Sequence, residues 1–166
     1  MQEGKSKYTF PHKQVIRFDF PERGSLPPVK VFWHDSMDKQ PDIEGVPAGE
    51  LLGDSDINGS LFIGDKGMVT TGCYGERTRL VPAERMKDYK MPSPVLTRSP
   101  GHYRDWIRAC KGGEAACSNF SVAGPFVQLM LLGTIAMSFE GTLEWDSQKM
   151  SFTHNNEANT YLQPRV

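Results

Sequence analysis

Apolar residues recur at helical spacing between residues 99 and 113. Four of them stand at positions i, i+3, i+4 and i+7: Tyr103, Trp106, Ile107 and Cys110. The opposite face carries Arg104, Asp105 and Arg108. Ser99 and Pro100 suit the start of such a helix, and Gly112 suits its end. The pattern predicts a half-exposed helix with its apolar face toward a core.

A second helix is predicted over residues 125–137. Gln128 and Thr134 are almost the only polar residues in this segment, so the helix is apolar nearly all round. A helix of this kind is normally buried on most sides, and we expect it to lie deep in the core. It is too short for a membrane span, which needs about 20 apolar residues.

Alternation of apolar and polar residues predicts strands in the first half of the chain. Residues 16–20 alternate, and residues 29–33 place Val29, Val31 and Trp33 on one face; a short Pro/Gly linker joins the two segments, as in an antiparallel pair. Residues 61–63 and 68–71 flank Gly-Asp-Lys-Gly, which we interpret as a hairpin turn and not as a phosphate-binding loop. Residues 35–60 follow no period and predict a long connection.

Strands come first along the chain and helices later, which is typical of the α+β class. We therefore predict an open, mostly antiparallel β-sheet with two main helices packed on one face. Residues 1–9 are polar and are expected to be a loose start, and residues 10–166 are expected to form a single domain.

Composition argues against some classes of function but does not identify one. The 166 residues include 19 basic and 20 acidic ones, a net charge of -1, which argues against a nucleic-acid or membrane partner. The three cysteines form no CxxC pair and the four histidines have no metal-ligand spacing, so we expect buried or free thiols and no metal site.

Four residues are candidates for contact with a small molecule. His102, in the first turn of the predicted helix, could donate a hydrogen bond to a hydroxyl group. Arg98 precedes that helix and could hold a carboxylate or phosphate. Trp33 and His34, at the end of a predicted strand, could contact a sugar ring. From the residues alone, the plainer interpretation of each is preferred: a solvated side chain, or for Trp33 a core position.

The chain resembles one branch of the glucose–fructose oxidoreductase/inositol dehydrogenase/MocA family. Matching segments occur in one order: 17–24 (RFDFPERG), 27–33 (PPVKVFW), 64–67 (GDKG), 80–86 (LVPAERM), 99–103 (SPGHY), 109–113 (ACKGG), 118–120 (SNF), 143–146 (LEWD) and 157–159 (EAN). The resemblance implies the C-terminal α+β domain of a two-domain enzyme. In that family, an N-terminal Rossmann domain binds NAD or NADP, and the open sheet commonly forms a dimer interface.

The sequence lacks the family's glycine-rich cofactor fingerprint and its Glu-Lys-Pro catalytic motif. The resemblance therefore implies a substrate-side and oligomerisation domain for a sugar or polyol derivative, with no catalytic or cofactor-binding residue in this chain and NAD or NADP bound by the parent enzyme. Two alternatives remain open: a stand-alone carbohydrate- or protein-binding module, and part of an NAD-dependent glycoside hydrolase. The compartment, cytoplasmic or periplasmic, is not determined by these residues.

Overall fold

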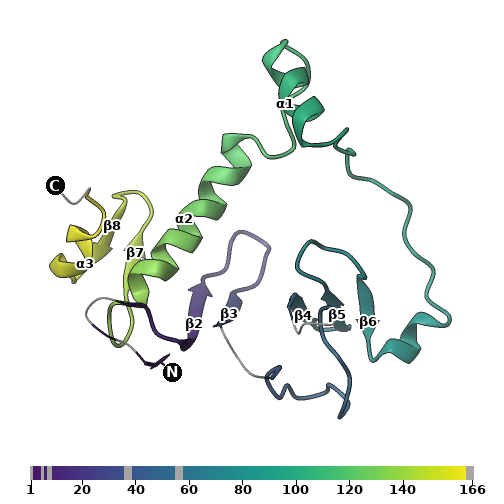
Figure 1. Cartoon of the computed structure of the whole chain (residues 1–166), viewed down its shortest axis with the longest axis horizontal. Helices are drawn as coiled ribbons and strands as arrows, with labels where there is room; N and C mark the ends of the chain where they lie inside the picture. The colour runs from purple at the N-terminus through teal and green to yellow at the C-terminus, as the bar shows by residue number, and fades with distance from the viewer. Residues whose placement is uncertain (1, 5, 7–8, 36–38, 55–57, 164–166) are drawn as a thin grey trace. The chain divides into compact units, whose positions relative to one another are not determined.

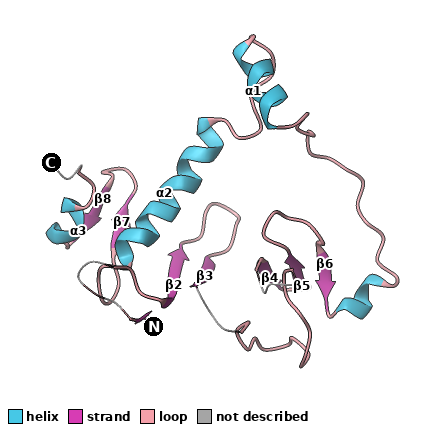
Figure 2. Ribbon diagram, in the orientation of Figure 1, coloured by secondary structure: helices cyan, strands magenta, loops and turns pink. Residues whose placement is uncertain are grey.

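A computed structural model describes residues 2–4, 6, 9–35, 39–54 and 58–163. The chain forms two compact units, one made of residues 1–36 and 96–166 and the other of residues 37–95. Small antiparallel sheets and helices make up the units, so the predicted α+β class with open antiparallel sheets is confirmed (Figure 2). The expected loose start, residues 1–9, lies partly outside the described residues.

The first unit begins with a three-stranded sheet in the order β1-β2-β3: β1 (Gln2–Glu3), β2 (Lys13–Phe20) and β3 (Val29–Asp35). Strands β2 and β3 pair antiparallel, as the alternation predicted, and the structure sets Ile16 opposite Trp33 and Phe20 opposite Val29. On β2, Arg17 and Asp19 are exposed, while the apolar residues that alternate with them, Ile16, Phe18 and Phe20, are partly covered.

The helices of this unit are α1 (His102–Cys110), α2 (Phe120–Ala136) and α3 (Asn156–Thr160). A short hairpin pairs β7 (Glu144–Asp146) with β8 (Ser151–Thr153), and the ring of Trp145 meets that of Phe152 edge to face, with centroids 5.1 Å apart. The side-chain amide of Asn159 fixes α3 to this hairpin, because it bonds both the N–H and the C=O of Phe152, at 2.8 and 2.9 Å.

Helix α2 starts five residues earlier than predicted. The Asn119 side chain accepts a hydrogen bond from Ser121 N at 3.0 Å and caps the helix, so Pro125 lies inside it and not at its start. The predicted deep burial is wrong: Gly133 is the one buried residue of this fully described helix. No helix in the described part of the chain is both long and apolar enough to span a membrane.

The second unit contains β4 (Ser60–Gly64), β5 (Gly67–Thr71), β6 (Arg79–Val81) and a 3₁₀ turn, η1 (Ala83–Met86). The strands form an antiparallel sheet in chain order (Figure 1). The predicted hairpin is confirmed, because Gly64 pairs with Gly67 across the turn. Val81 and Thr70 are fully buried, and the Thr70 hydroxyl links the chain at Gly53 to β4, accepting from Gly53 N at 2.8 Å and donating to Ser60 O at 3.1 Å.

Candidate functional site

The four residues predicted to contact a small molecule all lie in the first unit. Trp33 and His34 are on β3, His102 is the first residue of α1, and Arg98 precedes that helix. All four are exposed, and Trp33, at 49% exposure, does not occupy the core position that its strand suggested. Within the described part of the chain, no hydrogen bond or ion pair joins any two of them, so their shared role stays a prediction.

Helix α1 buries a charged residue, Asp105, from its polar face. Asp105 is only 4% exposed, and its carboxylate accepts from Arg108 Nη2 at 2.6 Å and from the backbone N of Cys117 at 2.8 Å. Arg108 also pairs with Glu114 at 3.2 Å. The carboxylate therefore holds the loop after α1 against the helix, on the side that the sequence assigned to solvent.

The apolar side of α1 consequently faces outward. Tyr103 is 84% exposed, and Trp106 and Ile107 are also exposed. This overturns the prediction that their face is turned toward a core. The buried ion pair of Asp105 decides the orientation, because a carboxylate stays buried only when it is paired and hydrogen-bonded.

An apolar groove of about 660 Å³ runs along α2 in the first unit. Trp145, Met150 and Leu162 complete its wall opposite the helix. Apart from the indole N–H of Trp145, Gln128 carries the one polar side chain among the lining residues, and its Nε2 lies 3.2 Å from the sulfur of Met150. The groove therefore suits an apolar surface and offers little to a charged one.

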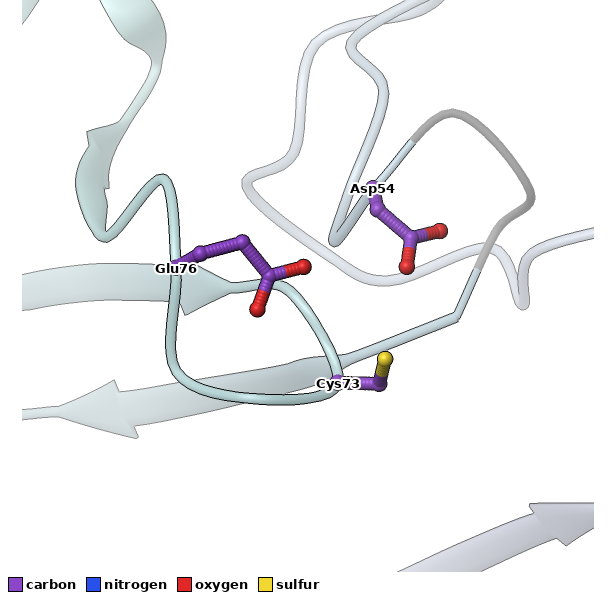
Figure 3. A group of neighbouring side chains, drawn as sticks. All are labelled: Asp54, Cys73 and Glu76. Atoms are coloured by element: carbon purple, nitrogen blue, oxygen red, sulfur yellow. The ribbon is translucent and has the colours of Figure 1, made fainter. Parts of the chain in front are cut away.

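The second unit brings together an acid–thiol cluster, which we define as Asp54, Cys73 and Glu76 (Figure 3). Their ligand atoms all lie within 4.8 Å of one another. Asp54 lies before β4, while Cys73 and Glu76 lie in the turn between β5 and β6. Backbone groups hold both carboxylates: Asn58 N donates to Asp54 at 3.1 Å, and Tyr74 N donates to Glu76 at 2.9 Å.

The cluster affects the chemistry of its thiol. Loss of hydration, and then the negative charges of Glu76 and Asp54, raise the pKa of Cys73 above its ordinary value. The group is therefore a protonated thiol at neutral pH and a weak nucleophile. Two carboxylates and a sulfur are donors that a divalent cation such as Zn²⁺ accepts, so these are the described residues best arranged to hold one.

Sequence reasoning missed this cluster, because no motif spacing links Asp54 to the turn that carries its two partners. The prediction of buried or free thiols is confirmed, since Cys73, Cys110 and Cys117 are all free, and all three are exposed.

Comparison with known proteins adds no assignment. No protein-family model matches this chain, and no curated protein matches it either.

Proposed function

We propose that this chain is the substrate-side and oligomerisation domain of an NAD(P)-dependent oxidoreductase that acts on a sugar or polyol derivative. The domain is not catalytic by itself. The resemblance described above motivates the enzyme class and the substrate class. The observation that carries the assembly role is the amount of large apolar surface on β3 and α2 that the first unit leaves uncovered.

Strand β3 offers such a surface on its predicted apolar side. Val29, Val31 and Trp33 alternate along the strand and all three are exposed, although two of them are β-branched and one is a large aromatic. Contiguous exposed patches of this kind on soluble proteins commonly mark interaction sites. A second copy of the chain on this open face would remove the patch from water, in a homodimer.

Helix α2 adds to the uncovered surface. Phe120 is 92% exposed, and Phe126 and Leu131 are also exposed, on a helix without a single charged residue. Burying apolar area is worth about 25 cal/mol per Å², so an apolar helix in contact with water carries a substantial drive toward a partner surface. Assembly is the function that this distribution supports best.

Three side chains give the substrate-side role its chemistry, since Trp33 is assigned here to the dimer face. His34 and His102 could bond the hydroxyl groups of a sugar. Arg98 would hold a carboxylate where the sugar is an acid. NAD or NADP belongs in this proposal to another part of the parent enzyme, and no residue of this chain is assigned to it.

The solution mass of the chain, measured by sedimentation over a range of concentrations, tests the assembly role. A stable dimer is expected, and Trp33→Glu should convert it to a monomer, because a charge would then lie in the open sheet face. Val95→Glu, at an exposed loop position, is the matched control and should leave the dimer intact.

A clean monomer at every concentration would overturn the assembly role. It would favour the stand-alone binding module, for which the α2 groove is the specific observation. Calorimetric titration with NADH tests the other half of the proposal, since tight binding by this chain alone would contradict its assignment as the domain without the cofactor site.

A further inference from the structure

The one Asn-Gly pair of the chain, Asn58 and Gly59, lies just before β4 in the second unit. Both residues are exposed. The Asn58 side-chain amide makes no hydrogen bond within the described part of the chain, and neither does the backbone N of Gly59. We infer that Asn58 is a site of spontaneous deamidation, a covalent modification that places a new carboxylate in the loop of Asp54.

The reaction needs only groups that this loop supplies and water. The backbone N of Gly59 attacks the side-chain carbonyl carbon, Cγ, of Asn58. A new C–N bond closes a five-membered succinimide ring, and the bond from Cγ to Nδ2 breaks. The side-chain NH2 group takes the proton from the Gly59 nitrogen and leaves as ammonia. Water then opens the ring at either carbonyl and leaves aspartate or isoaspartate.

Gly59 removes the usual obstacle to the attack. A side chain on the residue after asparagine crowds the attacking nitrogen, and glycine has none. Gly59 also has a φ of +144°, a conformation that residues with a side chain rarely adopt. Position 59 is closed to other residues as well, since a Cβ there would lie 2.2 Å from the carbonyl oxygen of Thr71.

Three other asparagines of the chain are protected by their contacts. The Asn119 side chain caps α2 and donates to Ala116 O at 2.9 Å, and a phenylalanine follows it. Asn155 caps α3 through Ala158 N at 2.9 Å. Asn159 bonds both backbone groups of Phe152. Each amide would have to break these bonds before its carbon could be attacked.

Modification would change the loop that holds Asp54. The backbone groups of Asn58 and Asp54 are joined by a hydrogen bond of 2.9 Å, and Asn58 N also bonds the Asp54 carboxylate. Isoaspartate lengthens the backbone by one methylene at this point, which would misalign both bonds. Either product also adds a negative charge beside the existing carboxylate.

Peptide mapping by mass spectrometry, after incubation of the folded full chain at neutral pH and physiological temperature, tests the inference. Asn58 should convert well before Asn119, Asn155 or Asn159, with isoaspartate detected by isoaspartyl methyltransferase labelling. The Asn58→Gln variant should release no ammonia on this time scale. A parallel sample unfolded in urea gives the rate of Asn58 deamidation in the absence of tertiary structure.

Two results would overturn the inference. One is an Asn58 that stays intact in the folded chain while it converts in urea, because the fold would then block the attack. The other is conversion of a capped asparagine at the same rate as Asn58. Neither result depends on the oxidoreductase proposal.

Discussion

Gly133 of α2 lies directly against Phe18 of β2. A Cβ at position 133 would be only 2.8 Å from Cζ of the phenylalanine ring, closer than packed carbon atoms approach. The glycine therefore lets the helix reach the strand. This close approach is how the first unit joins its longest helix to its sheet.

Gly133→Ala should destabilise the first unit. Alanine favours a helix by up to about 1 kcal/mol over glycine, but overpacking against a ring costs typically about 1–3 kcal/mol. We expect a net loss of about 1 kcal/mol in the free energy of unfolding, measured by urea denaturation.

Gly124→Ala is the matched control in the same helix, because a Cβ there would meet nothing within 4 Å. It should stabilise the chain by roughly 0.5–1 kcal/mol. Equal effects at positions 124 and 133 would contradict the close approach to Phe18.

Asp105→Ala should loosen the loop that follows α1. The change removes the acceptor for Arg108 and for Cys117 N, and unsatisfied buried donors cost about 1–3 kcal/mol. Hydrogen exchange at the Cys117 amide should accelerate along with the fall in stability.

Asp19→Ala is the control: it breaks an exposed pair with Arg17 and should cost at most about 1 kcal/mol. An unchanged exchange rate at Cys117 would show that the carboxylate does not hold the loop.

Glu76→Gln should make Cys73 more reactive. The carboxylate of Glu76 raises the pKa of the thiol, so its removal lowers that pKa and increases the thiolate fraction at a given pH. The rate of iodoacetamide alkylation of Cys73 is measured by peptide mass spectrometry across a pH series. The pH at which this rate rises should be lower in the variant than in the unchanged chain. Asp42→Asn, remote from the cluster in sequence and exposed, should leave the profile unchanged. Slower alkylation of Cys73 in the Glu76→Gln variant would contradict the effect assigned to the Glu76 charge.

Asp146 should make stability depend on pH in the acid range. The backbone hydrogen bond from Lys149 has the largest effect and lowers the pKa of Asp146 below its ordinary value of 3.8. Lost hydration opposes it, and the backbone hydrogen bond from Gln148 lowers the pKa further. A group whose folded pKa is lowered stabilises the fold above its unfolded pKa and loses that contribution as the pH falls through the folded pKa.

The Asp146→Asn variant cannot titrate at this position. Its stability, measured by urea unfolding, should therefore fall less than that of the unchanged chain between neutral pH and the acid side of 3.8. Parallel pH profiles for the two proteins would count against the role of Asp146.

Several local features were readable without the structure. The alternation over residues 16–20 and 29–33 predicted the β2–β3 pair, since successive side chains of a strand point to opposite faces. Glycines at both ends of the 64–67 turn predicted the β4–β5 hairpin. The order of strands and helices predicted the α+β class.

Burial was the part that local patterns misjudged. Amphipathic spacing says which residues of α1 share a face, but not which face meets protein. The face that meets protein is the one with Asp105, because its carboxylate accepts hydrogen bonds from Arg108 and from the backbone N of Cys117, a residue beyond the helix. Likewise, the composition of α2 predicts a core helix, yet Gly133 is its one buried residue.

The sequence by itself determined the local elements, because strand alternation, helical spacing and turn residues act over a few neighbouring positions. Only the tertiary structure decided the acid–thiol cluster and the inward turn of Asp105. Asp54 and Cys73 meet because β4 and β5 pair and the Thr70 hydroxyl ties in Gly53, a long-range arrangement that short-range spacing does not encode.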